Sequence, residues 1–330
     1  MTPMLIAVIV MALGFDFLNG IHDSSNVVAT MISSRAFSPR VALGTTALAN
    51  FIGPFLFGVA VADTIGHEVV DPSTITTEIV LAALVSAILW NLLTWFLGFP
   101  SSSSHALIGG VIGAVTIGAG WQEIKTEGLL KVLIPLFTSP LIGFAVGFIL
   151  LKIIVGLSWD ATPRINELFK RSQIVTGIAL ALSHGTNDSQ KTMGIITLAL
   201  VTAGYLKVFN VPIWVIVACA TMIALGTAVG GWKLIRTLGG KMFKIRPVDG
   251  FASQLASAGV IITASLLGGP VSTTQVVSSA IMGVGTGERA NKVRWGVAQE
   301  IVTAWLLTVP ASALVAAGVY ALLKLFSHQP

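Results

Sequence analysis

Long apolar stretches, separated by short polar connections, run along the whole chain. In helical form, about 20 such residues cross the ~30 Å hydrocarbon core of a bilayer. The stretches lie at 2–32, 41–61, 79–98, 104–120 and 129–155 in the first half, and at 174–203, 211–232, 251–268, 274–287 and 295–326 in the second. Two of them, 104–120 and 274–287, are shorter than the others. The pattern predicts an all-α, polytopic membrane protein with about 10 to 12 membrane segments.

Two motifs repeat along with this order of segments. NGIHDSSN around Asp23 resembles HGTNDSQK around Asp188, 165 residues later, and PSSSSHALIGG from Pro100 resembles PVSTTQVVSSAIMG, 170 residues later. Offsets near half of the 330-residue length indicate an internal duplication. Because each half has five segments, the second copy enters the bilayer from the opposite side, as in transporters with inverted repeats. We predict a first inverted repeat at 1–155, a connecting cytoplasmic loop at 156–173 and a second inverted repeat at 174–330.

The composition excludes an ordinary soluble protein. Apolar residues make up 54% of the chain and charged residues only 10%, against roughly 25% charged residues in soluble domains. The single cysteine, Cys219, excludes disulfides within the chain and cysteine-based metal sites. The net charge of +5 is better explained by membrane topology than by affinity for nucleic acid, so no nucleic-acid partner is expected.

The positions of Lys and Arg predict the orientation. If the N-terminus lies outside the cytoplasm, the loops on the cytoplasmic side carry fourteen Lys and Arg residues, including the basic loop 233–250, and the opposite loops carry four. Cytoplasmic loops are enriched in these residues. The sequence therefore predicts a multi-pass protein of the cell (inner or plasma) membrane, with both termini on the extracytoplasmic side.

Two acidic residues lie near the middle of long apolar stretches. An ionisable side chain at the bilayer centre costs at least ~2.5–3.5 kcal/mol, which is typical of a pathway or binding role. Asp23 and Asp188 each lie beside Gly and polar residues in a stretch of about 30 residues, which predicts two broken helices. Freed backbone carbonyls, together with Asp23, Asn26, Asn187 and Asp188, provide hard oxygen donors that suit Na⁺ or a proton. The alternative is a buried polar pair that only holds helices together.

A second pair of motifs places hydroxyl groups directly after a proline. The hydroxyl side chains are those of Ser101, Ser102, Ser103, Ser104, Ser272, Thr273 and Thr274. Proline stops the preceding helix, and Ser or Thr caps the next one. We predict two re-entrant, hairpin-like segments whose helix N-termini point to the centre and attract a tetrahedral oxyanion. The alternative is a polar loop with ordinary caps.

Further candidates are weaker as single residues. His22, Lys191 and Glu300 are candidates for lining a pathway, and Gln190 is a candidate ligand because it neighbours Asp188. His22, His105 and His184 either relay protons or donate hydrogen bonds to nearby backbone carbonyl groups. Asp16, seven residues before Asp23, lines the pathway or serves as a structural partner.

The segments NGIHDSSNVVAT and SHGTNDSQKTMG, the two proline-hydroxyl motifs and the basic loop between Trp232 and Phe251 resemble the inorganic phosphate transporter (PiT) family. The resemblance spans nearly the whole chain. It implies a cation-coupled phosphate symporter with inverted repeats, a homodimer and an elevator-like motion. The implied Na⁺ ligands are Asp23, Asn26, Asn187 and Asp188. The implied phosphate ligands are Asn187 and the hydroxyls of Ser101, Ser102, Ser103, Ser104, Ser272, Thr273 and Thr274. Thr186 and Gln190, which lie near Asp188 in the chain, are further candidate phosphate ligands.

Two departures from the family favour Na⁺ over H⁺ as the coupling ion. The family often has Glu where Gln254 stands and His where Gln275 stands, and neither glutamine titrates. The residues leave two other functions open and disfavour a third. A sulfate permease of the same family and an anion channel with the hydroxyl groups as its filter stay open. An intramembrane hydrolase is disfavoured, since no Ser-His-Asp order or zinc spacing emerges. We therefore expect no enzyme activity and no cofactor besides the coupling ion.

Overall fold

The computed structural model describes residues 1–71, 73–237 and 244–327, and these residues form an elongated bundle of helices. The first half contains α1 (Pro3–Ser33), α2 (Pro39–Ile52), α3 (Ala60–Asp63), α4 (Thr77–Leu97), α5 (Ser103–Gly118) and α6 (Thr126–Leu157). The second half contains α7 (Ile165–Thr202), α8 (Ile213–Val229), α9 (Trp232–Arg236), α10 (Pro247–Leu266), α11 (Thr273–Arg289) and α12 (Trp295–Ser327). Each predicted apolar stretch lies largely in helix, which confirms the all-α prediction.

Four helices, α1, α4, α6 and α12, are long and apolar enough to cross a bilayer. A fifth candidate is the bent pair Pro39–Phe55 and Ala60–Glu68, whose two parts differ in direction by 71°. Helices α5 and α11 have 16 and 17 residues. At ~1.5 Å per residue, both are shorter than the hydrocarbon core of ~30 Å. The number of 10 to 12 membrane segments therefore stays a prediction, as do the re-entrant segments.

The expected breaks in α1 and α7 are wrong, because both helices continue through the Asp23 and Asp188 motifs. The glycines beside the two aspartates serve close packing between helices. A Cβ atom on Gly20 would lie 2.3 Å from the carbonyl oxygen of Ile223 in α8, and one on Gly185 would lie 2.4 Å from that of Asn50 in α2. Helices that approach this closely require glycine at the contact, and no backbone carbonyl has to be freed.

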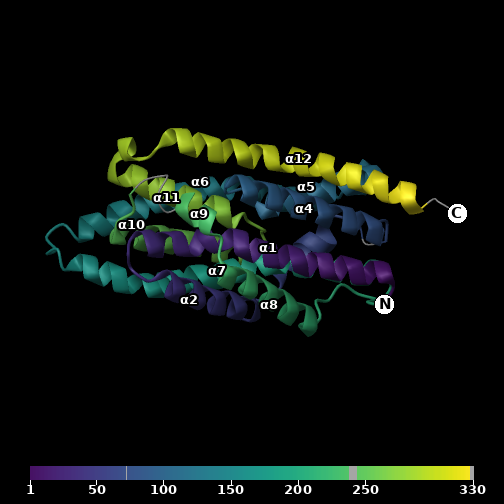
Figure 1. Ribbon diagram of the computed structural model, residues 1–330, viewed down its shortest axis with the longest axis horizontal. Coiled ribbons are helices and arrows are strands. Elements are labelled where there is room, and N and C mark those ends of the chain that lie inside the picture. Colours follow the sequence, from purple (N-terminus) through teal and green to yellow (C-terminus); the bar gives the residue numbers. More distant parts are fainter. Residues whose placement is uncertain (72, 238–243, 328–330) are drawn as a thin grey trace.

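The helix pairings of the two halves correspond to each other (Figure 1). Helix α1 packs on α8 and α4, and its counterpart α7 packs on α2 and α10. In the same way α5 packs on α12, and α11 packs on α6. These matched pairings support the internal duplication, while the domain boundaries and the inverted orientation stay predictions. The connection between α6 and α7 is shorter than the predicted loop 156–173, because α7 already begins at Ile165.

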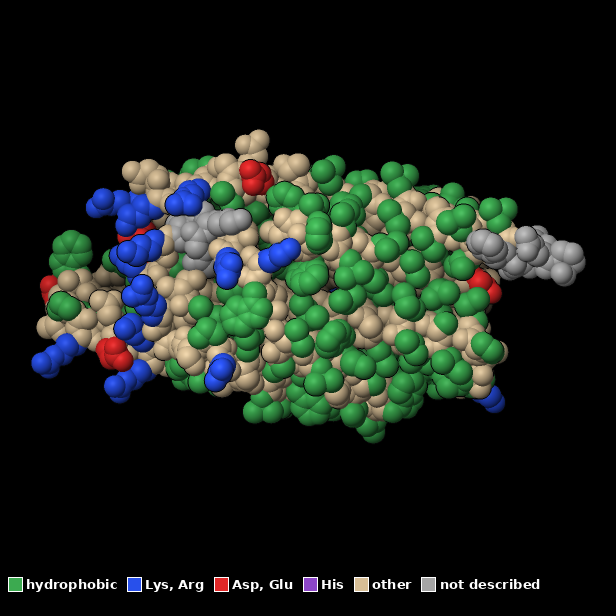
Figure 2. All heavy atoms as spheres, in the orientation of Figure 1, with side chains coloured by type: hydrophobic (Ala, Val, Ile, Leu, Met, Phe, Trp, Pro, Cys, Tyr) green, Lys and Arg blue, Asp and Glu red, His purple; other side chains and the backbone are tan. Residues whose placement is uncertain are grey.

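Basic side chains gather at one end of the bundle. Both chain termini lie at the other end, and the turn between α6 and α7 lies at the basic end (Figure 1). Figure 2 shows Lys and Arg concentrated toward that turn, with an apolar surface over much of the remaining face. Part of the predicted basic loop 233–250, residues 238–243, lies outside the described residues. The asymmetry is the one expected at the cytoplasmic side of a membrane protein.

The middle parts of α1 and α7 are enclosed by the other helices. Residues 22–31 of α1 and 183–200 of α7 are all buried, although both segments contain many polar side chains. Buried polar groups are costly unless they are hydrogen-bonded. The partners of these side chains therefore identify the candidate site.

Candidate ion and anion site

Asp23 of α1 and Asp188 of α7, far apart in sequence, converge on one histidine. Both carboxylates have 0% exposure. The Nε2 atom of His184 lies 3.0 Å from Oδ2 of Asp188 and 3.9 Å from Oδ2 of Asp23. One ligand atom from each of these three residues fits within 4.8 Å of the others. The two repeated motifs thus form a single buried cluster.

The two proline-hydroxyl motifs, which we call the first tip (residues 100–104) and the second tip (residues 270–274), have parallel construction. Gly98 with φ 75° and Gly268 with φ 73° end the helices before them, in a conformation that favours glycine. Ser102 then caps α5 by accepting from the backbone N–H of His105 at 3.1 Å, and Ser272 caps α11 by accepting from that of Gln275 at 3.3 Å. The predicted caps are confirmed.

The hydroxyl groups of both tips reach the two carboxylates. Thr274 donates to Oδ1 of Asp23 at 2.7 Å, and Ser103 donates to Oδ2 of Asp23 at 3.4 Å. Thr273 donates to Oδ2 of Asp188 at 2.9 Å. The starts of two short helices therefore face the carboxylate pair at one place. Their unpaired N–H groups and helix dipoles favour negative charge there.

Lys191 supplies a buried positive charge in this cluster. Its side chain is 2% exposed, and its Nζ atom donates to Oδ1 of Asp188. The same atom donates to Oγ of Ser104 at 2.6 Å and to the carbonyl oxygen of Val271 at 2.7 Å. Ser104 also donates to the carbonyl oxygen of Val271 at 3.1 Å, so this lysine lies where the two tips meet.

His184 is oriented by a partner that sequence reasoning missed. Asn50 of α2 donates to Thr227 of α8 at 2.8 Å, and its Oδ1 atom lies 3.1 Å from Nδ1 of His184. Both ring nitrogens of His184 therefore face oxygen acceptors. The signal in the sequence was a lone asparagine in the apolar stretch 41–61, which carries no information on its partner. His22 lies beside Asp23, with its Nδ1 atom 3.1 Å from Oδ1 of that carboxylate.

Two predicted cation ligands have different surroundings. Asn26 donates to Oγ1 of Thr274 at 3.1 Å, so it joins the cluster through a hydroxyl that binds Asp23. The amide of Asn187 instead holds the second tip: it donates to Oγ of Ser265 at 2.8 Å and accepts from the backbone N–H of Val271 at 3.2 Å.

Three other predicted ligands, two on α7 and one at the first tip, have partners outside the pair of carboxylates. Gln190 accepts from the backbone N–H of Val61 at 2.9 Å and donates to the carbonyl of Gly58 at 2.8 Å. Thr186 donates to the carbonyl of Leu182 in its own helix at 2.8 Å. Ser101 shares a 2.7 Å hydrogen bond with Thr94 of α4. Their side chains are buried but are engaged by backbone or by the scaffold around the cluster.

The remaining candidates lie around the cluster. Asp16 accepts from Thr192 at 2.6 Å, which joins α1 to α7 one turn or more away from Asp188. His105 lies at the start of α5, with Nδ1 2.7 Å from Oγ of Ser102. Gln254 accepts from Thr176 at 2.6 Å and donates to Thr30 at 2.8 Å, a connection of α10 to α7 and α1.

Glu300 is not brought into the cluster. Its side chain is exposed on α12, at a groove of about 570 Å³ that α12 forms with α4. Trp90 and Leu93 line the same groove. Among the described residues, the carboxylates and tip hydroxyls of the central cluster do not line this groove. Thr94, which bonds Ser101 of the first tip, does line it.

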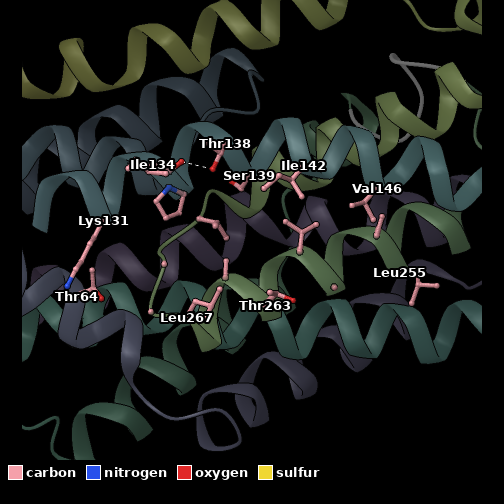
Figure 3. Close-up of a pocket in the computed structure, with 18 of the residues that line it drawn as sticks. Thr64, Lys131, Ile134, Thr138, Ser139, Ile142, Val146, Leu255, Thr263 and Leu267 are labelled. Carbon is pink, nitrogen blue, oxygen red and sulfur yellow. Dashed lines mark hydrogen bonds between the residues drawn. The ribbon is translucent and has the colours of Figure 1, made fainter. Parts of the chain in front are cut away.

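A larger groove of about 760 Å³ lies between α6 and α10 (Figure 3). Ile134, Ile142 and Val146 line it from α6, and Leu255 and Thr263 line it from α10. One part of its wall is formed by Gly269 and Val271, directly before and within the second tip. Most of its lining is apolar, which suits hydrocarbon better than an ion, so the groove adds no ligand to the central cluster.

The chain is similar to known phosphate transporters. The family described as "Phosphate transporter family" matches residues 19–316. A "Probable low-affinity inorganic phosphate transporter" of Bacillus subtilis is 45% identical over 324 residues, which cover 97% of each chain. A protein of the same description from Rhizobium meliloti is 45% identical over 320 residues, which cover 96% of each chain. These relatives are named as transporters, which confirms the expectation that the chain is not an enzyme.

A solved structure also has this fold. The protein described as "The sodium-dependent phosphate transporter" superposes with a TM-score of 0.88, over 98% of this chain and 100% of that chain. Its sequence is 24% identical, so this likeness concerns the fold alone.

Proposed function

The chain belongs to the phosphate transporter family, and from this premise we propose that it is a symporter that moves inorganic phosphate together with Na⁺ across the cell membrane. One observation carries the proposal. Two hydroxyl-bearing helix starts, from corresponding places in the two halves, converge on the buried carboxylates Asp23 and Asp188. An arrangement of this kind offers donors to an oxyanion and acceptors to a cation at the same point.

The anion ligands in this proposal are the tip hydroxyls, with the N-terminal N–H groups of α5 and α11. Ser103, Thr273 and Thr274 donate to carboxylates, and hydroxyls can rotate to donate to a phosphate oxygen instead. Helix N-termini commonly bind phosphate. Ser104 and Lys191 lie at the meeting point of the tips and add a donor and a positive charge.

The charge of the site explains the need for a cation. A phosphate anion that enters beside two buried carboxylates meets repulsion that low dielectric strengthens. A cation bound at the carboxylates reduces this repulsion, so each solute raises the affinity for the other. We therefore expect Na⁺ to bind first and phosphate to complete the site. The loaded site is then close to neutral and can cross the membrane more readily than a half-loaded one.

Na⁺ is favoured as the coupling ion for two reasons. Carboxylate and hydroxyl oxygens are hard donors that suit such cations. In addition, the protein with the same fold is described as sodium-dependent. H⁺ is the alternative, because His184 lies between the carboxylates and an amide oxygen, with acceptors at both ring nitrogens. The experiment below separates the two ions.

The transport cycle that fits this proposal is alternating access between two inverted repeats, with an elevator-like motion of the part that holds the site. The matched helix pairings of the two halves support the repeats. The concentration of Lys and Arg at one end of the bundle supports a cytoplasmic location for that end and an extracytoplasmic location for both termini. The homodimer that the family resemblance implies stays a prediction, which the mass of the protein in lipid nanodiscs tests.

Uptake of labelled phosphate into proteoliposomes tests the proposed function. We expect saturable uptake when an inward Na⁺ gradient is imposed, and little uptake when K⁺ replaces Na⁺ at constant pH. Uptake that follows an inward H⁺ gradient and ignores Na⁺ would transfer the coupling to protons. A passive current that does not saturate would identify an anion channel, and equal uptake of labelled sulfate would identify a permease with wider specificity.

A further inference from the structure

The two repeats differ in the residue that follows each aspartate by three positions. Aligning the motifs at Asp23 and Asp188 places Asn26 opposite Lys191, each three residues after its aspartate. Aligning the tips at Pro100 and Pro270 places Ser104 opposite Thr274. A neutral amide in one half thus corresponds to an ammonium group in the other half. The histidines of the cluster are exchanged as well, because Asn19 aligns with His184 and His22 aligns with Asn187.

The contacts of these two side chains are equivalent as well. Asn26 donates to Thr274 of the tip from the other half, and Lys191 donates to Ser104 of the tip from the other half. In the first case Thr274 itself donates to Asp23 at 2.7 Å. In the second case the ammonium group of Lys191 lies between Ser104 and Asp188 and binds both. The lysine therefore places a positive charge at a carboxylate where its counterpart places none.

The surroundings of the Lys191 ammonium are those of a bound cation. Its acceptors are three oxygen atoms: one carboxylate oxygen, one hydroxyl oxygen and one backbone carbonyl oxygen. This is the kind of oxygen set that also coordinates small metal cations. Asp23 has a different environment. Its described partners are two hydroxyls and the imidazoles of His22 and His184, with no Lys or Arg among the described residues.

We propose that the ammonium group of Lys191 is a tethered cation that takes the place of a coupling ion at Asp188, so that the mobile coupling ion binds at Asp23 alone. The inference rests on the proposed function, because it presumes cation-coupled phosphate transport. It assigns Lys191 a specificity-determining role in ion stoichiometry. The tethered charge travels with the protein in both directions of the cycle, so it contributes no net charge movement per phosphate.

The placement of Lys191 links Asp188 to both tips. Lys191 contacts Ser104 of the first tip and Val271 of the second tip in addition to Asp188, so it joins the carboxylate to the hydroxyls proposed to bind phosphate. A buried ammonium group needs acceptors for its three N–H donors, and two of them here are supplied by the tips. The placement predicts that removal of the charge changes how many ions accompany phosphate, and does more than lower stability.

The decisive variant is Lys191→Asn, which gives the second half the residue of the first. Two readouts are compared with the unaltered protein: the number of ²²Na⁺ ions bound per phosphate bound in equilibrium dialysis, and the charge moved per labelled phosphate in proteoliposomes. We expect one additional Na⁺ per phosphate in the variant and one additional charge per phosphate transported. Lys207→Met, which removes an exposed lysine outside the cluster, is the matched control and leaves both ratios unchanged.

The outcomes separate the inference from the proposed function. Unchanged ion and charge ratios in Lys191→Asn, with Na⁺-coupled uptake intact in the unaltered protein, overturn the inference and leave the proposed function standing. Loss of cation dependence in the unaltered protein overturns the proposed function. If Lys191→Asn binds both solutes but does not transport, the dialysis ratio alone decides. If it does not fold, Lys191→Gln is measured in the same way.

Discussion

The two tips have the same construction but are held by different helices. The first tip is held by helices outside the charge cluster: Thr94 of α4 bonds Ser101 at 2.7 Å, and Trp305 of α12 donates to the carbonyl of Pro100 at 3.0 Å. The second tip is held by α7 itself, through Asn187 and Lys191, which both bind Val271. The second tip is therefore coupled to the helix that carries Asp188, and the first tip to the outer helices.

This difference indicates how the two tips can separate. Their direct connections run through few groups, chiefly Ser104 with Val271 and Lys191 with Ser104. A displacement of α7 relative to α4 and α12 would carry the second tip along and leave the first tip behind. The site is thus held from two sides, by α4 and α12 at the first tip and by α7 at the second tip. Substitutions can therefore test the contributions of the two sides separately.

The largest effect is expected for folding stability in Asp188→Asn. The change leaves the buried ammonium of Lys191 without its carboxylate, and breaking a buried ion pair in this way costs ~3–5 kcal/mol. Asp23→Asn removes no lysine partner and is expected to cost clearly less. Thermal unfolding of the purified variants in detergent measures the difference. Equal losses in both variants would contradict the asymmetry between the two halves.

The next effect concerns transport in the same two variants. Each carboxylate accepts hydrogen bonds from tip hydroxyls, and bonds to charged groups contribute ~1.5–3 kcal/mol each. We therefore expect phosphate uptake to fall by roughly 100-fold in each variant, at equal amounts of folded protein in the membrane. Glu300→Gln, which changes an exposed carboxylate outside the cluster, serves as control. Wild-type uptake in both aspartate variants would exclude the assigned site.

Asn187→Ala weakens the support of the second tip. The change removes the acceptor of the Val271 N–H and the donor to Ser265, and a buried group left without a partner costs ~1–3 kcal/mol. We expect phosphate affinity to fall by about tenfold or more, because the tip is no longer held near Asp188. Isothermal titration with phosphate at fixed Na⁺ measures this. An unchanged affinity would mean that the other contacts of the tip are sufficient.

Single hydroxyls of the tips are expected to have smaller effects. Thr274→Ala removes a donor to Asp23, and Ser104→Ala removes an acceptor of Lys191. In each variant the charged group keeps another partner, Ser103 for Asp23 and Asp188 for Lys191, so we expect phosphate affinity to fall about fivefold, or ~1 kcal/mol. Isothermal titration with phosphate at fixed Na⁺ measures the affinity of each variant, and an unchanged affinity would mean that the hydroxyl does not bind phosphate. Thr286→Ala, a hydroxyl that bonds only its own helix, is the control.

The smallest effect is expected from the support of the first tip. Trp305→Phe keeps an aromatic side chain, although a smaller one, and removes the indole N–H that donates to the carbonyl of Pro100. That neutral hydrogen bond contributes ~0.5–1.5 kcal/mol. We expect a slight loss of thermal stability and unchanged ion coupling. A loss of coupling as large as that in Asn187→Ala would show that the two supports act alike, against the comparison drawn above.

Much of the fold was predictable because apolar length and helix caps are local properties. The predicted helices and the caps at Ser102 and Ser272 follow from the residues themselves. The breaks in α1 and α7 were predicted wrongly for a related reason. Gly20 and Gly185 indicate either a break or a close helix contact, and only the position of α8 and α2 decides between these.

The partners inside the site were predictable only in part. The repeated motifs indicated that Asp23, Asp188 and the tip hydroxyls form one site. A buried charge is costly, and corresponding segments of two repeats commonly meet at a shared binding site. The contacts of Asn187 and Gln190 depend on segments that are distant in sequence, near Val271 and Gly58. In a helix, Asn187 points about 100° and Gln190 about 200° away from Asp188 around the axis, so closeness in the chain does not predict which groups the two amides contact.

The hydrogen bonds between Gln190 and the bend after α2 have a consequence for the order of folding. Its amide satisfies the carbonyl of Gly58 and the N–H of Val61, which the bend leaves without helical partners. Unsatisfied backbone groups are not tolerated in a buried setting. Gln190 follows Val61 by 129 residues and belongs to the second half, so a nascent chain with its first half alone lacks this amide. We therefore expect the bend after α2 to reach its final structure only after α7 has been synthesised and has packed against it.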